Sequence, residues 1–173
     1  MRRILLIITG LMALNGCSTL HQSGREPAPF GETWVVMPFV NNTETPFAAE
    51  RAEAITTALL YARGVKRVLT VPQEPSADAD LLSDRGLKRY QQGVEWAKKN
   101  SVRFALVGTV TEWRYKVGLD GEPVAGMTLQ LVDLSSDKVL WSGSSGKSGW
   151  SREAVSAVAQ QVLEKLIATI ELR

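Results

Sequence analysis

One stretch of the sequence, Leu140 to Trp150 (LWSGSSGKSGW), contains residue types that could bind phosphate. Its Gly146-Lys147-Ser148 matches the end of the G-x-x-x-x-G-K-[ST] pattern, in which backbone N–H groups and a lysine cradle the phosphates of a nucleotide. The first glycine of the pattern is missing, because Trp141 occupies its place and would keep the backbone away from phosphate. Only 25 residues follow Ser148, too few for a helix and then a strand with a magnesium-binding acid. We therefore expect no nucleotide site.

Residues for other catalytic or metal chemistry are scarce. The chain has one cysteine and one histidine, Cys17 and His21, and both precede the expected folded domain. Neither a Ser-His-Asp triad nor a Cys-His pair can therefore be built in the domain, and a zinc site of Cys or His ligands is excluded by count. Three aspartates of one loop resemble part of a calcium site but lack its glycine and terminal glutamate; they are Asp78, Asp80 and Asp84. A carboxylate pair for glycoside cleavage can be drawn from any 18 acidic residues, and surface solvation explains them more simply. The sequence predicts no enzyme, no cofactor and no bound metal.

The N-terminus has the pattern of an export signal. Two arginines precede an apolar run of 11 residues, 4–14, which is shorter than the roughly 20 residues that span a bilayer. The run ends in Leu14-Asn15-Gly16-Cys17-Ser18, which resembles a bacterial lipoprotein cleavage box. In such proteins the cysteine becomes the first mature residue and carries the acyl chains, palmitate among them, and Ser18 in place of an Asp implies the outer membrane. An ordinary signal peptide with a cysteine at its cleavage site is the alternative.

These features divide the chain into a signal peptide (1–16), a lipidated Cys17 with a flexible tether (17–32), and one folded domain (33–173). The tether is polar and contains Pro27 and Pro29. Of the 20 Lys and Arg residues, two lie in the signal, so 18 remain against 18 acidic residues. A nucleic-acid-binding domain has a clear basic excess, so we expect no nucleic-acid partner.

The pattern of apolar residues predicts the elements of the domain. We expect strands at 33–39, 65–71 and 104–115, a returning strand around 127–131 after a hairpin turn at 118–123, and a strand at 139–141. Helices are expected at 47–63, ended by Gly64, at 87–99, and at 152–172, with Ser151 as N-cap. The order β-α-β-α-β-β-β-α indicates a single compact α/β domain with a mixed sheet.

Trp150 is flanked in sequence by two basic residues, Lys147 and Arg152. A tryptophan beside cations is typical of a lipid headgroup interface, where the ring is half buried and the cation meets phosphate. A tryptophan at this place could equally pack against the start of the last helix. The sequence leaves both interpretations open.

Three stretches carry a family resemblance. They are GVEWAKKNSVRFALVGTVTEWRYKVGLDGEPVAGMTLQLVD, LWSGSSGKSGW and SREAVSAVAQQVLEKLI. From about Trp34 to the end, the chain resembles the PelC family, the outer-membrane lipoproteins of Pel exopolysaccharide export. More widely, Val36-Met37-Pro38-Phe39 and Leu106 to Val110 resemble the domain of curli secretion lipoproteins, penicillin-binding-protein activator lipoproteins and the N-terminal domain of TolB.

The resemblance implies a non-catalytic ring of identical subunits beneath the outer membrane, lipid-anchored on its periplasmic side. Such a ring would work with the β-barrel exporter PelB in biofilm matrix secretion and attract a cationic exopolysaccharide through an acidic surface. It places Trp150, Lys147 and Arg152 at the membrane. The candidate acids are Asp120 and Glu122 of the hairpin and, as a second option, Asp78, Asp80 and Asp84; ordinary loop solvation is the alternative for each.

A monomeric lipoprotein activator of a peptidoglycan synthase is the alternative function. It would need a long tether to cross the cell-wall mesh, and only 15 residues separate Cys17 from Thr33. The short connection favours the export function.

Overall fold

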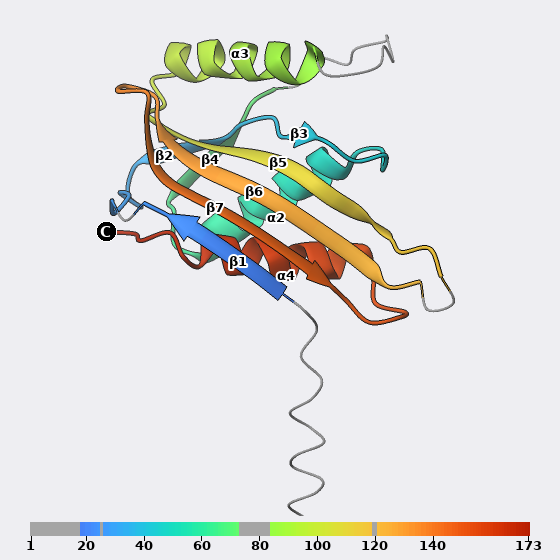
Figure 1. Cartoon of the computed structure of the whole chain (residues 1–173). Coiled ribbons are helices and arrows are strands. Elements are labelled where there is room, and N and C mark those ends of the chain that lie inside the picture. Colours follow the sequence, from blue (N-terminus) through green and yellow to red (C-terminus); the bar gives the residue numbers. More distant parts are fainter. Residues whose placement is uncertain (1–17, 25, 73–83, 119–120) are drawn as a thin grey trace, which may run out of the picture.

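The computed structural model describes residues 18–24, 26–72, 84–118 and 121–173, with the backbone alone for 84–87. Its described strands form one seven-stranded sheet (Figure 1). They are β1 (Ser18–Ser23), β2 (Thr33–Val36), β3 (Val40–Asn41), β4 (Arg67–Thr70), β5 (Phe104–Tyr115), β6 (Pro123–Asp133) and β7 (Lys138–Ser148). The order is β1-β7-β6-β5-β2-β4, and β3 pairs with β5. Strand β2 is parallel to β4 and β5, whereas β5, β6, β7 and β1 are antiparallel, so the sheet is mixed as expected.

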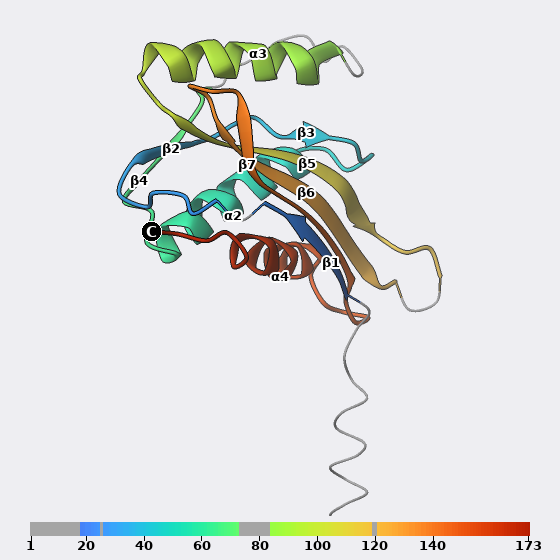
Figure 2. The same ribbon diagram turned by 60° about the vertical axis from the view of Figure 1, so that its left-hand side comes forward.

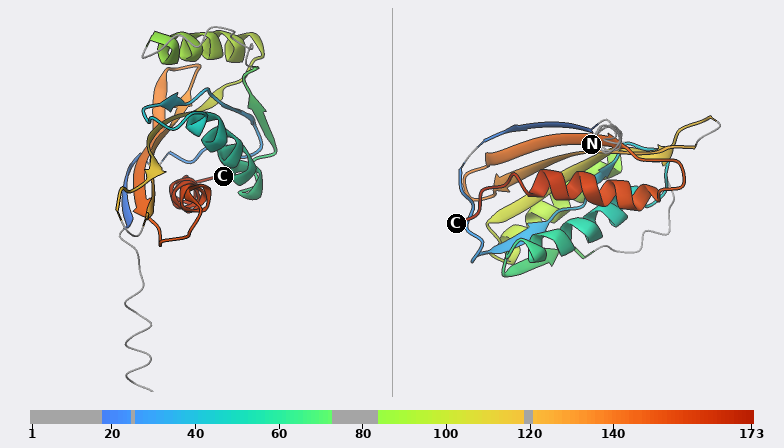
Figure 3. Two further views of the ribbon diagram at one scale, coloured as in Figure 1. Left: turned by 90° about the vertical axis from the view of Figure 1, so that its right-hand side faces the viewer. Right: turned by 90° about the horizontal axis from the view of Figure 1, so that it is seen from below.

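Helices cover both faces of the parallel part of the sheet. Helices α2 (Ala48–Ala62) and α4 (Val155–Ile167) lie side by side on one face, and α3 (Asp84–Lys99) lies away from both (Figure 3). Because side chains alternate along a strand, each strand serves two cores. In β2, Trp34 and Val36 pack in the larger core with α2 and α4, and Val35 packs in a smaller core with α3.

The predicted α/β order is confirmed by β2-α2-β4-α3-β5-β6-β7-α4, to which the structure adds β1 and β3. Gly64 ends α2 as predicted, with a φ of 95°, a conformation that glycine adopts without strain. The start of the last helix is corrected. Helix α4 begins at Val155 with Ala154 as N-cap, not after Ser151, because residues 150–153 form a turn closed by the Glu153 N–H, which donates to the Trp150 carbonyl at 3.0 Å.

The expected tether is also corrected. Residues 18–23 are strand β1, paired with β7 over six residues. Ala28 is fully buried; its N–H donates to the Glu171 carbonyl at 2.8 Å, and its carbonyl accepts from the Arg173 N–H at 3.0 Å. Every side chain of β1 except the partly buried Leu20 is exposed, so the strand has no apolar alternation that sequence could reveal.

Candidate functional site

The residues that resemble a phosphate loop are part of a strand. Gly146 lies in β7 between Gly126 of β6 and Thr19 of β1, and Lys147 and Ser148 complete the strand. Helix α4 begins only at Val155, seven residues beyond Ser148. The backbone N–H groups of this stretch therefore lie in a sheet and do not form the turn into a helix that cradles phosphate.

Several of the predicted membrane residues lie at one end of the sheet. Figure 2 shows the start of β1 there, beside the loop that joins β7 to α4. Ser18, the first residue after Cys17, lies opposite Lys147. On the next strand, Val124 lies opposite Ser148, and the Pro123 carbonyl accepts from the Gly149 N–H at 2.8 Å. We call this end, formed by Ser18, the tip of the β5–β6 hairpin, the end of β7 and residues 149–154, the hairpin end. It brings the start of the described chain next to Trp150.

The loop that carries Trp150 is held by packing and hydrogen bonds. A Cβ on Gly149 would lie 2.5 Å from both Glu153 Oε2 and Val158 Cγ2, so any larger residue would force these side chains to shift. Glu153 Oε2 accepts from the Trp150 N–H at 3.1 Å, and Glu153 Oε1 accepts from Gln161 Nε2 at 3.1 Å. These bonds fix the backbone of Trp150 to the first half of α4.

Trp150 is 58% exposed, so it is not buried against α4. Two neighbouring apolar side chains that the sequence analysis missed are also exposed at this end, Tyr115 at 51% and Val117 at 102%. Tyr115 Oη accepts from the Val155 N–H at 3.2 Å, which ties the hairpin to the start of α4. An apolar residue directly before the predicted turn was the available signal for Val117.

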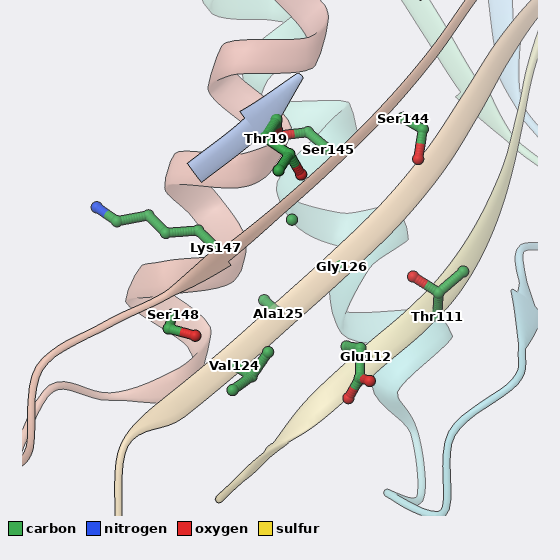
Figure 4. A pocket seen from close by; sticks show the side chains of 11 residues that line it. Thr19, Thr111, Glu112, Val124, Ala125, Gly126, Ser144, Ser145, Lys147 and Ser148 are labelled. Carbon is green, nitrogen blue, oxygen red and sulfur yellow. The ribbon is translucent and has the colours of Figure 1, made fainter. Parts of the chain in front are cut away.

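The basic residues of this end have different settings. Lys147 Nζ bonds Gln161 Oε1 of α4, and Figure 4 shows its side chain extending away from Thr111 and Glu112. Arg152 is exposed and holds a φ of 78°, an uncommon conformation for a residue with a side chain. A third cation, Lys165, was not predicted; its Nζ donates to Ser18 Oγ at 2.9 Å. Helical spacing alone could not have placed it beside β1.

The acidic candidates are described only in part. Glu122 forms an ion pair with Lys116 at 2.8 Å, which offsets its charge. Asp78, Asp80 and Asp120 lie outside the described residues, and of Asp84 the structure describes only its place as the first residue of α3. Glu112, which the sequence analysis did not select, is paired with Arg114 at 2.8 Å.

A shallow hollow of about 320 Å³ lies on the sheet beside the hairpin end (Figure 4). Small and hydroxyl side chains from four strands line most of it, among them Thr19, Thr111, Gly126, Ser144 and Ser148. Its ionisable lining groups are Glu112 and Lys147. The carboxylate of Glu112 is paired with Arg114 Nε at 2.8 Å.

Two carboxyl groups with shifted pKa values lie outside the hairpin end. Burial raises the pKa of Glu53 to about 7, although the Phe39 N–H donates to its Oε1 at 2.7 Å and the Arg89 guanidinium is 3.9 Å away. Hydrogen bonds from Arg103, at 3.0 and 2.7 Å, hold the pKa of Asp133 well below its usual range, helped by Ser135. Both carboxyl groups connect different segments of the fold, so we assign them to stability and not to the candidate site.

Within the described part of the chain, no three His, Cys, Asp or Glu residues gather as metal ligands would. No helix among the described residues has the length and apolar character needed to cross a membrane.

Comparison with protein-family profiles gave no match, and comparison with curated protein sequences gave none either. Several solved structures are similar to this chain. The PelC dodecamer from Paraburkholderia phytofirmans is 34% identical, with a TM-score of 0.76 over 91% of this chain and 99% of that chain. Lipoprotein GNA1162 from Neisseria meningitidis (18% identity, TM-score 0.54, 80% and 97% coverage) and the LpoB C-terminal domain from Salmonella enterica (17%, 0.52, 72% and 88%) share the fold. With a third of its residues identical over nearly the whole length of the first of these proteins, this chain belongs to the PelC family.

Proposed function

We propose that this chain is a lipid-anchored subunit of a ring at the periplasmic face of the outer membrane. The ring guides a cationic exopolysaccharide, Pel, to the β-barrel exporter PelB during secretion of the biofilm matrix. The anchor is Cys17, which carries acyl chains, and several such chains together bind a bilayer stably.

The observation that carries the proposal is the composition of the hairpin end. The residue after Cys17 is Ser18, and it lies opposite Lys147 in the sheet, two residues before Gly149 and three before Trp150. Lipid attached to Cys17 therefore meets the end of the domain that exposes Trp150, Tyr115 and Val117 and carries Arg152. Exposed aromatic and aliphatic side chains beside cations suit a headgroup interface.

Ring formation is supported by the family. The similar PelC protein from Paraburkholderia phytofirmans is a dodecamer in its crystals. Light scattering and negative-stain imaging of the lipidated protein in mild detergent test this part directly. We expect a closed ring; a monodisperse monomer would contradict it and favour an activator of a single enzyme.

The polymer-guiding role rests on acidic side chains, with Asp120 and Glu122 as first candidates. Lys116 offsets the charge of Glu122, so Lys116, Asp120 and Glu122 together carry −1, and replacing both acids by lysine changes this sum to +3. We expect the double variant Asp120→Lys, Glu122→Lys to reduce secreted polymer while rings still assemble. The matched control replaces two exposed acids elsewhere, Glu164→Lys with Glu171→Lys, and should secrete normally.

Normal secretion by the hairpin variant would remove the hairpin from the polymer path. Asp78, Asp80 and Asp84 would then be the acids to replace next. Loss of rings in the same variant would instead place the hairpin in a contact between subunits.

A further inference from the structure

The segment that follows the proposed lipid anchor, residues 18–23, is a strand of the sheet and not a free tether. A free tether of 15 residues could extend roughly 50 Å from the membrane. Instead, the six residues Ser18–Ser23 form β1, in continuous register with β7 from Ser18 opposite Lys147 to Ser23 opposite Ser142. The sheet therefore begins one peptide unit after Cys17, and consecutive Cα atoms are only about 3.8 Å apart.

Side-chain contacts reinforce the pairing of β1 over its first half. At its start, Lys165 Nζ donates to Ser18 Oγ at 2.9 Å. In the middle, the buried Ser145 hydroxyl donates to the Thr19 carbonyl at 2.6 Å, and Leu20 packs on the larger core. These contacts come from β7, from α4 and from the larger core, so the strand is held by more than its backbone pairing.

The far end of β1 is closed against β7 as well. Gly24 follows the strand with a φ of 87°, and a Cβ there would lie 2.4 Å from the Leu140 carbonyl oxygen. Glu26 then forms an ion pair with Lys138 at the start of β7. The chain cannot pass this point so closely with any residue but glycine, so a specific backbone path ends the strand.

From these contacts we propose that β1 is a rigid strap between the lipid and the domain. It holds the hairpin end against the membrane and fixes the height and orientation of the sheet above it. The inference rests on the proposed lipidation of Cys17. Its consequence for a ring is that every subunit stands at the same height before assembly, which lowers the ordering cost of bringing the subunits together.

Two insertions distinguish a strap from a tether. A 12-residue Gly/Ser segment, beginning with Ser, is inserted between Cys17 and Ser18 in one variant and between Arg25 and Glu26 in the other. Both lengthen the chain from lipid to Thr33 equally, by a root-mean-square span of about 20 Å. Only the first lies between the lipid and β1; the second lies beyond the strand.

The height of the protein layer above a planar bilayer is measured by neutron reflectometry on the purified, lipidated full-length mature protein. We expect the first insertion to raise or broaden the layer by up to about 20 Å and the second to leave it unchanged. Equal displacement by both insertions would overturn the strap while leaving lipidation and the proposed function intact. Failure of the wild-type protein to stay on the bilayer would overturn the proposed anchor, and the strap with it.

A disulfide tests the pairing independently of the insertions. His21 and Ser144 are cross-strand partners, and the Cα atoms of such a pair are about 4.5–5.5 Å apart, within the range of a disulfide. We expect His21→Cys with Ser144→Cys to cross-link in the exported, lipidated protein and to keep the wild-type height. His21→Cys with Ser142→Cys, which is out of register, is the control and should not cross-link. Absence of the cross-link in the first variant would overturn the strap.

Discussion

The exposed ring of Trp150 allows a quantitative prediction for membrane binding. A tryptophan offers about 150–250 Å² of surface, and Trp150 is 58% exposed. Moving all of that exposed area, about 120 Å², into an apolar environment would contribute about 3 kcal/mol at 25 cal/mol per Å². A ring at the headgroup level is half buried, so we expect about half of this, on the order of 1.5 kcal/mol and therefore about tenfold in partitioning.

The assay uses the mature protein with Cys17→Ser, whose reversible binding to vesicles containing anionic lipid is measured by sedimentation. We expect Trp150→Ala to lower the partition coefficient about tenfold, without a change in thermal stability, because the ring is not packed in a core. The matched control is Phe30→Ala. Phe30 is an aromatic residue that is 39% exposed, and its N–H donates to the Arg173 carbonyl at 3.2 Å. It therefore lies beside the C-terminus, at the opposite end of the sheet from the hairpin (Figure 1).

Two results would refute this reasoning. Unchanged partitioning of Trp150→Ala would remove the ring from the membrane interface. An equal loss in Phe30→Ala would mean that binding follows total apolar surface and not the hairpin end.

Three further predictions concern stability, each measured by chemical denaturation of the same mature protein. Burial raises the pKa of Glu53 from 4.5 to about 7, so its contribution to the free energy of unfolding is fully present below pH 4.5 and is lost as the pH rises through about 7. Glu53→Gln should remove this pH dependence and be more stable than wild type at pH 8, by up to about 3 kcal/mol. Equal pH dependence of the two proteins' unfolding free energies would contradict this. Arg103 lowers the pKa of Asp133, so the contribution of Asp133 to the free energy of unfolding is present above about pH 4 and is lost on acidification. Asp133→Asn should cost about 2 kcal/mol at pH 7, and the difference in unfolding free energy between variant and wild type should narrow toward pH 3. A difference that stays constant with pH would rule out the ion pair as its cause. Gly149→Ala should lower the free energy of unfolding by about 1–3 kcal/mol through overpacking. The control is Gly146→Ala, whose added Cβ would meet its nearest atom at 3.6 Å and which should change stability by less than about 0.5 kcal/mol. Equal costs for the two variants would show that the neighbours of Gly149 move aside freely.

Much of the fold could be predicted because the pattern of apolar residues in its central strands and helices matches the faces that they bury. Phe104 to Val110 is apolar on both faces because each face meets a helix-bearing core, and the stripe Val158, Val162 and Leu166 of α4 is fully buried. Gly64 ends α2 because a positive φ leaves few other residues free of strain. These local rules gave the element order and the mixed sheet.

The candidate site was predictable in its residue types and not in its arrangement. Trp150 between cations indicated an interface, but whether the ring packed or projected depended on Gly149, Glu153 and α4, which fix the loop from outside its own sequence. Val117 directly precedes the predicted turn, yet only the hairpin's position beside residues 149–154 makes it part of the same surface.

The sequence by itself determined the export signal pattern, the scarcity of catalytic side chains and the family, because these depend on residue identity and on spacing along the chain. The tertiary structure alone decided that residues 18–23 are a strand. An edge strand with solvated side chains gains its stability from backbone hydrogen bonds to β7 and from contacts with Ser145 and Lys165, more than 120 residues away in sequence. Such bonds depend on the partner strand and leave no pattern in the segment's own residues. The same physical reason places Ser18, the residue that follows Cys17 in sequence, beside Lys147 at the end of the sheet.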